Sequence, residues 1–331
     1  MNVGSNNKSI MKAYIILLIC IFSLNEAIAQ IEKIDSTNLA KLIEFSNNTY
    51  TDEILILHKS QVVCHWKSKN CDSITFSTAS MVKSWTGLVI GILVGKRIIP
   101  SEEVLVCDFL PEWKDGCENK VTIKQLLTMS AGLNRRSGTR GILPQENMNL
   151  YVQNVELDTL PNIRFNYSNE SVQLLGLVIE RITGMSANDY FRQVLFEPLG
   201  MNATRLGKDP IGNDIVFGGA TTTVEDASKI GLLMMNNGIH DNEQIVSESW
   251  IKKSISPSEK ASYYGYLWWL DNNSENKNYA ATGDFGQMTI VFPNLELVYI
   301  RRQSCNKDIS GNMKWMGPDF LKLLSSIIKD K

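Results

Sequence analysis

The chain has 331 residues, 44% of them hydrophobic, which is enough to fill the core of one large domain or two ordinary ones. Its 33 Lys and Arg against 35 Asp and Glu give a net charge of −2. This balance offers no basic field for a nucleic-acid backbone, and 22 Gly and 9 Pro are too few for a collagen-like or low-complexity chain. We therefore expect a globular protein with no nucleic-acid partner.

Residues 1–29 have the layout of an export signal. Lysines precede an apolar stretch, 13–24, that is shorter than the roughly 20 residues a membrane span needs. Ala27-Ile28-Ala29 then offers a cleavage site with small residues. An amphipathic or membrane anchor is the alternative. We expect a mature domain, 30–331, that is exported to the periplasm or secreted and keeps no stable membrane span.

The mature chain contains an odd number of cysteines, in a compartment that permits disulfides. They are Cys64, Cys71, Cys107, Cys117 and Cys305. Cys64 can pair with Cys71, and Cys107 with Cys117, but buried free thiols fit the spacing equally well. The histidines are His58, His65 and His240. Neither they nor the cysteines have a metal-ligand spacing, so we expect no metal site and no cofactor.

Hydrophobic periodicity predicts strands near both ends of the mature chain and helices in its middle. The predicted strands are 54–57, 61–63, 264–270, 278–283, 287–292 and 297–302. The predicted helices are 39–45, 80–95, 122–129, 170–182, 187–195, 224–237 and 320–328. The helix 80–95 is apolar on all faces, which is typical of a helix buried between layers.

This order of elements predicts an α+β fold. An antiparallel sheet joins N-terminal and C-terminal segments, is flanked by helices and receives an inserted all-α lobe. We place the α/β part at about 30–105 and 240–331 and the helical lobe at about 106–239. Active sites often lie between two such lobes.

A nucleophile with a lysine base is the chemistry that the sequence favours. The chain has no G-x-S-x-G segment, so a serine-histidine pair is poorly supported. Ser80 and Lys83 stand at i and i+3 at the start of the apolar helix, where they share a face. Burial would weaken solvation of the lysine charge and so favour a proton acceptor. A capping serine followed by a surface lysine is the alternative.

Three ordered motifs resemble those of the serine β-lactamase and penicillin-binding protein superfamily. They are Ser80-Met81-Val82-Lys83, Tyr167-Ser168-Asn169 and Ala281-Thr282-Gly283. The Tyr-x-Asn form is similar to the class C β-lactamase-like branch, which also contains esterases, D-amino peptidases and 6-aminohexanoate-dimer hydrolase-like amidases. The resemblance spans roughly 54–302. It implies the β-lactamase/transpeptidase-like fold.

The resemblance also implies roles for these positions. Ser80 would be the acylated nucleophile, Lys83 its proton partner and Tyr167 the proton shuttle for the leaving group. Asn169 would orient the lysine and the substrate. The backbone N–H groups of Ser80 and Asp284 would form the oxyanion hole. Taken singly, Tyr167 could instead be a packed aromatic residue and Asn169 a helix N-cap.

Substrate recognition is where the sequence departs from the family. The third motif usually begins with Lys or His, but here it begins with Ala281, so a cation for a substrate carboxylate is missing. Arg135 or Arg136 could replace that cation. We expect Thr282 and Gly283 to contact the substrate. The candidate lining of an apolar pocket is Trp85 and Tyr266, together with Tyr264, Trp268 and Trp269; the alternative for these aromatic residues is a core position.

The sequence therefore predicts an exported serine hydrolase that acts on a small-molecule ester, amide or peptide. A true β-lactamase or D-Ala-D-Ala carboxypeptidase is the second hypothesis. A non-catalytic homologue that binds peptides or cell-wall ligands is the third.

Overall fold

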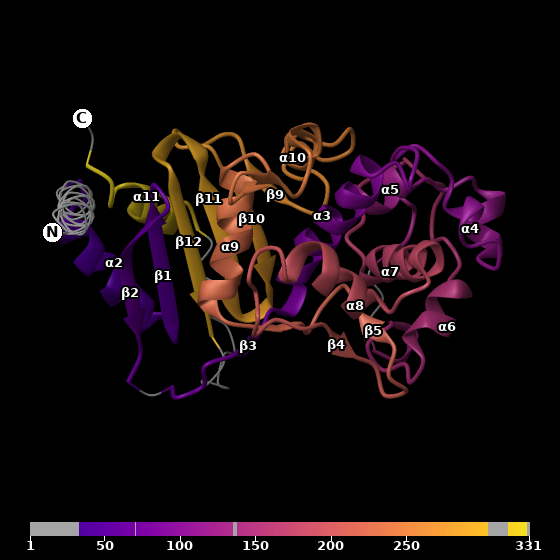
Figure 1. Cartoon of the computed structure of the whole chain (residues 1–331), viewed down its shortest axis with the longest axis horizontal. Helices are drawn as coiled ribbons and strands as arrows, with labels where there is room; N and C mark the ends of the chain where they lie inside the picture. The colour runs from indigo at the N-terminus through magenta and orange to yellow at the C-terminus, as the bar shows by residue number, and fades with distance from the viewer. Residues whose placement is uncertain (1–32, 70, 135–137, 304–316, 330–331) are drawn as a thin grey trace, which may run out of the picture.

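The structure is a computed structural model that describes residues 33–69, 71–134, 138–303 and 317–329. Its centre is a six-stranded antiparallel sheet in the order β2-β1-β12-β11-β10-β9 (Figure 1). The strands are β1 (Glu53–His58), β2 (Gln61–Lys67), β9 (Trp269–Asp271), β10 (Asn278–Gly283), β11 (Gln287–Phe292) and β12 (Leu297–Arg302). The sheet joins both ends of the domain, as predicted, and the α+β fold is confirmed.

Both faces of strands β1, β11 and β12 are covered, and every residue in them is buried, including the charged Glu53, Arg301 and Arg302. β1 pairs with β12 from Glu53–Arg302 to His58–Leu297. β2 is an edge strand, and its outward positions are exposed. The sheet therefore has a solvent edge at β2 and, at the other end, the short strand β9.

The outer face of the sheet is covered by the first and last described helices, α2 (Ser36–Asn48) and α11 (Pro318–Ser325). Their apolar side chains form a cluster with Ile54, Ile56 and Ile290 from the sheet. Phe320 stacks on Phe45, with ring centroids 5.4 Å apart. We call this face the outer face.

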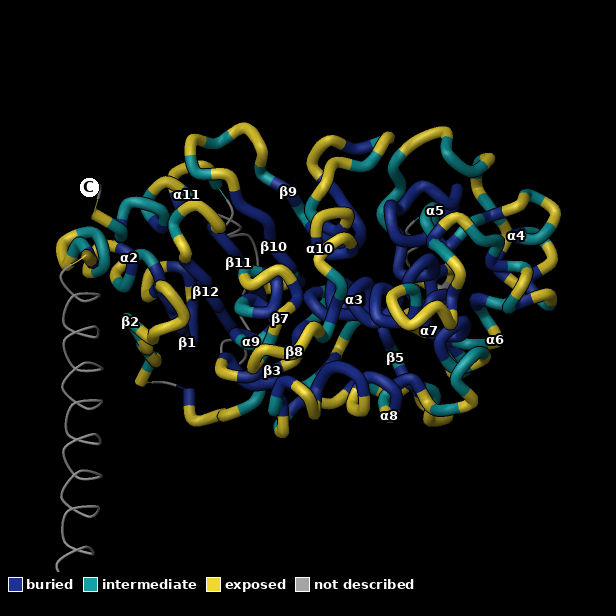
Figure 2. The backbone as a smooth tube through the Cα atoms, turned by 45° about the horizontal axis from the view of Figure 1, so that its top comes forward, coloured by how far each residue is buried: buried dark blue, intermediate teal, exposed yellow. Residues whose placement is uncertain are grey.

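The opposite face carries α3 (Val82–Gly95) and α9 (Val224–Met235). α3 is buried along almost its whole length, as its apolar sequence predicts (Figure 2). The predicted boundary of the helical lobe differs here, because α9 packs on the sheet rather than on the lobe. A Cβ on Gly231 of α9 would lie 2.4 Å from Val298 of β12, so a glycine permits this close approach.

The lobe lies beyond α3 and consists of short helices and one long one, α7 (Asn169–Thr183). The others are α4 (Lys114–Glu118), α5 (Ile123–Leu127), α6 (Met148–Gln153), α8 (Ala187–Phe191) and a π-helical turn, Arg192–Phe196. Thr122 and Gln125 form a capping box at the start of α5. Gly184 ends α7 in the left-handed conformation, with φ +67°.

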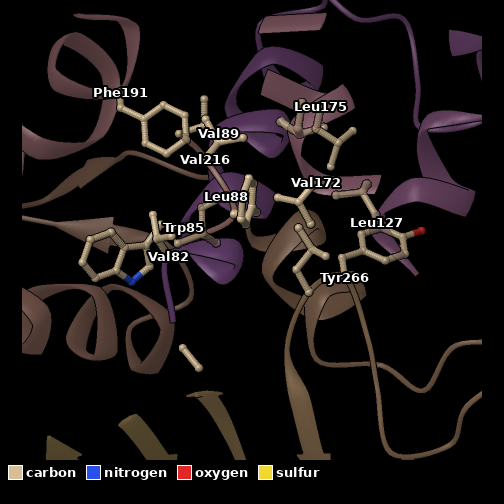
Figure 3. Packing of buried hydrophobic residues seen from close by; sticks show 14 of the residues in the cluster. Val82, Trp85, Leu88, Val89, Leu127, Val172, Leu175, Phe191, Val216 and Tyr266 are labelled. Atoms are coloured by element: carbon tan, nitrogen blue, oxygen red, sulfur yellow. The ribbon is translucent and has the colours of Figure 1, made fainter. Parts of the chain in front are cut away.

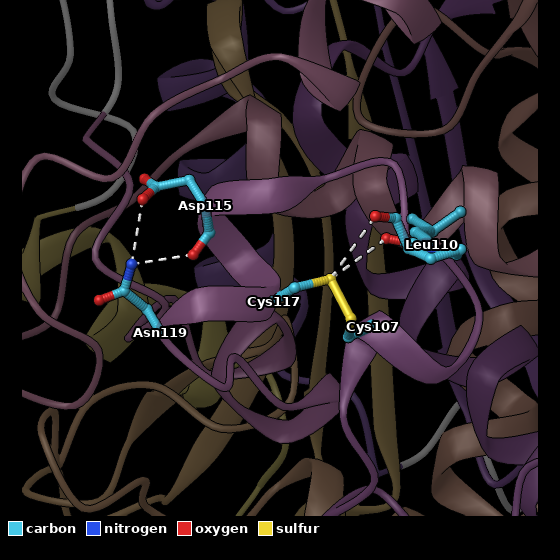
Figure 4. The surroundings of a disulfide bond; sticks show 6 residues. Cys107, Leu110, Asp115, Cys117 and Asn119 are labelled. Carbon is cyan, nitrogen blue, oxygen red and sulfur yellow. Dashed lines mark hydrogen bonds between the residues drawn. A yellow bond between two sulfur atoms is a disulfide. The ribbon is translucent and has the colours of Figure 1, made fainter.

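A disulfide joins Cys107 to Cys117 and closes the start of the lobe (Figure 4). Cys71 is also disulfide-bonded. Cys64 is a free thiol, so the alternative pairing of Cys64 with Cys71 is wrong. Cys305 lies outside the described residues.

One predicted strand is wrong over most of its length. Of the predicted strand 264–270, only Trp269 and Leu270 belong to β9, and the preceding residues turn. Leu267 has φ +62°, which an extended strand does not accommodate. The apolar alternation in this segment comes from side chains that enter the core from a turn.

The remaining described elements are short. They are β3 (Phe76–Ser77), β4 (Gly207–Lys208), β5 (Asp214–Ile215), β6 (Thr221–Thr222), β7 (Ile239–His240), β8 (Glu243–Gln244) and α10 (Glu248–Ser254), with single 3-10 turns at Ala79–Met81, Val106–Asp108, Gly138–Arg140, Asp284–Gly286 and Pro293–Leu295. Among the described residues, no helix combines the length and the apolar character needed to cross a membrane. The predicted signal, residues 1–29, lies outside the described part.

Candidate active site

Ser80 lies in the 3-10 turn that leads from β3 into α3. The backbone on both sides of this turn is tied to the segment before β6. Thr78 N–H donates to the Ala220 carbonyl at 2.8 Å, and Gly219 N–H donates to the Ala79 carbonyl at 3.2 Å. Ala79 has φ +45°, a strained conformation for a non-glycine residue. The turn therefore holds the half-buried Ser80 in one orientation.

Lys83 lies one helical turn after Ser80 and is only 1% exposed. Its Nζ donates a hydrogen bond to Ser80 Oγ at 2.9 Å and a second to the carbonyl of Phe217. The same Nζ lies 5.2 Å from the centroid of the Tyr167 ring. The alternative of a surface lysine is wrong. The amine is fixed between a hydroxyl and an aromatic ring.

Tyr167 comes from the loop that enters α7. Asn166 N–H donates to the Met129 carbonyl at 2.7 Å, which anchors this loop beneath α5. The Tyr167 ring stacks on Trp269, with centroids 5.8 Å apart, and meets the edge of Tyr264 at 6.4 Å. Burial, and secondarily the nearby Tyr167, raise the pKa of Tyr264 well above its ordinary value. Tyr264 is therefore a neutral support under Tyr167.

Asn169 is the first residue of α7 and is 6% exposed. It is not the N-cap, because the Ser168 side chain accepts the capping hydrogen bond from Ser171 N–H. Asn169 therefore lies at the same end of α7 as Tyr167.

The third motif lies directly against the nucleophile. Gly283 ends β10, and a Cβ at this position would lie 2.3 Å from the Thr78 carbonyl oxygen and 3.0 Å from the Ser80 nitrogen. Only glycine allows this approach. Asp284, the next residue, is exposed and begins a 3-10 turn in which Phe285 has φ +66°. Ser80 and the backbone of 283–284 are therefore neighbours.

Comparison with known proteins agrees with these motifs. The Beta-lactamase family model matches residues 75–301. The chain belongs to the Beta-lactamase family. It is 21% identical over 308 residues to 6-aminohexanoate-dimer hydrolase of Paenarthrobacter ureafaciens, a match that covers 81% of this chain and 76% of the relative. A 26% identical match to protein flp of Staphylococcus aureus covers 59% of this chain and only 41% of flp.

Solved structures of low identity share the fold. A Bacillus anthracis structure with the same dimer-hydrolase designation gives a TM-score of 0.73 at 20% identity and covers 86% of this chain and 79% of that chain. EstCE1, described as a hydrolase with promiscuous acyltransferase activity, gives 0.70 at 13% identity and covers 88% and 98%. At these low identities the likeness shows a shared fold.

Two predicted substrate-binding residues lie in the core. Trp85 is fully buried and meets the edge of Phe196 at 5.9 Å, and Figure 3 shows it with Tyr266 among packed apolar side chains. Tyr266 packs on Trp250 at 5.3 Å, and its hydroxyl donates to Glu102 at 3.3 Å. The structure thus favours the core alternative for both. Their aromatic bulk predicted a pocket, but it fills the space between α3 and its neighbours.

Two parts of the site were not predicted from sequence. The Phe217 carbonyl binds Lys83 through its backbone, which leaves no signature in residue type. Tyr263 precedes a buried turn, and its ring stacks on that of Trp269 with centroids 6.3 Å apart. Its signal was the density of aromatic residues in 263–269, which we interpreted as a strand.

β10 carries no cationic side chain that could bind a substrate carboxylate. Ala281 is buried, at 0% exposure, in the position where the family usually has Lys or His. Arg135 and Arg136, the predicted substitutes, lie outside the described residues. Thr282 is half-buried beside Gly283 and remains available at the strand end.

A group of three side chains elsewhere could hold a metal ion. Atoms of Glu53, His65 and Glu225 lie within 4.8 Å of one another. His65 Nε2 is 2.7 Å from Glu53 Oε1, while Arg302 Nε donates to the other oxygen of Glu53. These residues belong to β1, β2 and α9, which carry none of the Ser80 site.

Proposed function

We propose that this chain is a serine hydrolase that cleaves an ester or amide through an acyl-enzyme at Ser80. The observation that carries the proposal is the 2.9 Å hydrogen bond between Lys83 Nζ and Ser80 Oγ in a buried setting. An amine held at this distance can accept the hydroxyl proton without moving. Burial removes water that would otherwise stabilise the lysine charge.

The first half of the reaction forms the acyl-enzyme. Ser80 Oγ bonds to the substrate carbonyl carbon while its proton passes to Lys83 Nζ. The oxyanion receives hydrogen bonds from the N–H groups of Ser80 and Asp284, each worth on the order of 10²- to 10³-fold in rate. The bond to the leaving oxygen or nitrogen then breaks, and Tyr167 delivers the proton to that atom.

The second half releases the acid. Water attacks the acyl carbon and gives its proton to Tyr167, and Lys83 Nζ returns its proton to Ser80 Oγ as the bond from that oxygen to carbon breaks. Asn169 and Thr282 would position the substrate. No cofactor takes part in these steps.

The substrate class is a neutral ester or a linear amide. Ala281 supplies no charge to pair with the carboxylate of a β-lactam or of a D-Ala-D-Ala peptide. The relative named 6-aminohexanoate-dimer hydrolase supports a linear amide. A β-lactamase or D-Ala-D-Ala carboxypeptidase is the second candidate, favoured by the family match alone.

We also propose that the protein is exported after cleavage following Ala29. The apolar stretch 13–24 and the Cys107–Cys117 disulfide support this location. Fractionation of cells that express the full chain should yield a mature species beginning at Gln30 by mass spectrometry. An uncleaved chain in the cytoplasmic fraction would contradict it.

Two substrates and one probe test the activity. We expect the mature protein to hydrolyse p-nitrophenyl butyrate and to leave a chromogenic cephalosporin unchanged. A fluorophosphonate should add one phosphonyl group to the wild type, with loss of fluoride, and nothing to Ser80→Ala. Ser77→Ala, an exposed serine three residues earlier, is the matched control and should be labelled like the wild type.

The outcomes separate the candidates. Fast cephalosporin turnover would replace the esterase or amidase assignment with β-lactamase. Absence of label on Ser80, with saturable ligand binding retained, would replace catalysis with the non-catalytic binding hypothesis.

A further inference from the structure

A cavity of about 160 Å³ lies at the outer face of β10, near the third motif. Its lining is mainly apolar and comes from β9, β10, β11, α11 and the turn before β9. The lining residues that the argument uses are Tyr263, Trp269, Ala280, Thr282 and Leu321. Ala280 and Leu321 belong to the apolar cluster of the outer face. The cavity therefore lies on the side of β10 opposite to the contact between Gly283 and Ser80.

Two residues connect this cavity to the proposed chemistry. Thr282, from the third motif, forms part of its wall. Trp269 forms another part and stacks on Tyr167, whose ring lies 5.2 Å from Lys83 Nζ. Lys83 Nζ in turn is 2.9 Å from Ser80 Oγ. A continuous series of contacts therefore leads from the nucleophile to the cavity.

β9 pairs with only part of β10. β9 pairs with β10 only from Asn278 to Ala280, so its ladder ends at the Ala280–Trp269 pair. Beyond this pair, the strand 281–283 continues to Gly283 without β9 beside it. An arm of a substrate bonded at Ser80 would have to cross this edge to enter the cavity.

The position of Tyr167 identifies which arm reaches the cavity. The oxyanion donors lie at the Gly283–Asp284 end of β10, and the cavity lies at the Ala280–Thr282 end. In the proposed function Tyr167 delivers the proton to the leaving atom, and its ring packs on the cavity wall at Trp269. The leaving group therefore points toward the cavity, and the acyl group points away from it.

We propose that this cavity binds an apolar leaving group, the alkyl chain of an alcohol or amine. This inference rests on the proposed acyl-enzyme function and names its substrate class. At roughly 30 Å³ for each water-sized group, the cavity accommodates a chain of about five heavy atoms. Tyr263 and Trp269, which stack on each other, contribute aromatic surface to the lining, and Leu321 contributes an apolar side chain from α11.

One acidic side chain lies in the lining, and it is already engaged. Asp271 accepts hydrogen bonds from Asn273 N–H at 3.2 Å, Ser274 N–H at 3.1 Å and Asn278 Nδ2 at 3.3 Å. These bonds hold the carboxylate in its own turn. A terminal ammonium on the leaving chain is therefore not required, and its effect is measurable.

The experiment compares two series of esters on the wild type. In alkyl butyrates from ethyl to pentyl, kcat/KM should rise by roughly fourfold for each added methylene, the factor expected for its burial. In ethyl esters with acyl chains of the same lengths, the rise should be absent. A pentyl chain with a terminal amine should react no better than the plain pentyl chain.

Two variants of α11 provide the matched test. Leu321→Trp fills the cavity and should abolish the dependence on alcohol length. Leu323 is also partly buried against the outer face but does not line the cavity, so Leu323→Trp should keep the wild-type dependence. Inhibition of the wild type by 1-pentanol, and its loss in Leu321→Trp, gives a second reading independent of turnover of the long esters.

Failure of this proposal differs from failure of the proposed function. If a fluorophosphonate labels Ser80 but alcohol length has no effect, the leaving-group site is wrong and the hydrolase remains. A rise along the acyl series instead would assign the cavity to the acyl group and overturn the proposal. Preference for the amine-terminated chain would overturn its apolar character. If Ser80 is never labelled, the proposed function itself fails.

Discussion

The outer face of the sheet and the junction between β10 and α3 are both buried, but they bury different groups. On the outer face, Phe320 stacks on Phe45 and meets the edge of Tyr299 at 5.6 Å. At the junction, buried Lys83 and half-buried Ser80 are held by backbone carbonyls and an aromatic ring. The first region stabilises the fold through apolar area, and the second places polar atoms. Substitutions should therefore lower stability on one side and activity on the other.

The largest expected effect is at Lys83. Lys83→Met keeps the length of the side chain but removes the proton acceptor, so ester turnover should fall by about 10³-fold or more. Since a buried amine costs desolvation, the free energy of unfolding should drop by less than about 1 kcal/mol. Steady-state kinetics and urea unfolding measure the two quantities. A variant that unfolds in step with its loss of activity would erase the distinction between the regions.

Phe320→Ala should produce the reverse result. Removing a buried aromatic side chain from the outer face should lower the free energy of unfolding by about 3–5 kcal/mol. Activity for each folded molecule should stay the same, because the ring contacts α2 and β12 and not the nucleophile. Fluorophosphonate titration of active Ser80, combined with thermal unfolding, separates the two. Slower labelling of the folded fraction would contradict the prediction.

Gly283→Ala tests the contact where the sheet meets the nucleophile. The added Cβ would lie 2.3 Å from the Thr78 carbonyl, so the Ser80 turn must shift. A displacement of this kind should cost about 10²-fold in kcat. Gly95→Ala at the end of α3, where nothing lies within 4 Å of the new Cβ, is the control and should react normally. Equal rates for both variants would show that the approach of β10 is not needed.

Asp209 is a buried polar residue outside the candidate site, so it tests whether buried polar groups stabilise the fold without affecting activity. Burial raises the pKa of Asp209, but hydrogen bonds from Met148, Asn213 and Ile211 outweigh it and hold that pKa below its ordinary value of 3.8. The ionised carboxylate thus stabilises the fold above pH 3.8, and this contribution is lost as pH falls through the lowered pKa.

Asp209→Asn should therefore lower the free energy of unfolding by about 1–2 kcal/mol at pH 7. The difference from the wild type should shrink as pH falls below 3.8, because the unfolded chain there begins to bind the proton that the native carboxylate still excludes. Urea unfolding at pH 7 and pH 3 measures it, with ester turnover as the control. A loss of activity for each folded molecule would link this lobe to the chemistry.

Predictions from sequence succeeded where the pattern of residue types matches the burial of a regular strand or helix. β1, β11 and β12 have apolar residues on both faces because both faces are covered, and α7 has a capping serine and a terminal glycine. The segment 264–268 has the same aromatic density, but its side chains enter the core from a turn. The periodicity of hydrophobic residues alone does not distinguish a buried strand from a turn whose side chains enter the core. The same ambiguity led to Trp85 and Tyr266 being expected at the substrate.

For the candidate site, motif order predicted the proximity of Ser80, Lys83, Tyr167 and Gly283. What holds them was not predictable, because the partners are main-chain atoms. The Phe217 carbonyl and the Thr78 backbone have no characteristic side chain. Stacking of Tyr263 and Tyr167 with Trp269 depends on a turn geometry that residue types do not encode.

The short segment 217–220 holds the nucleophile and its lysine together. The Phe217 carbonyl accepts from Lys83, Gly219 N–H donates to the Ala79 carbonyl, and the Ala220 carbonyl accepts from Thr78 N–H. All three contacts use main-chain atoms, so a side-chain substitution does not remove them directly. Alanine at Phe217 would delete a buried ring whose centroid lies 5.4 Å from Lys83 Nζ, and alanine at Gly219 would be strained at φ +71°, so an alanine scan would report those effects. Backbone ester substitution at 217–220 would report on the main-chain contacts themselves.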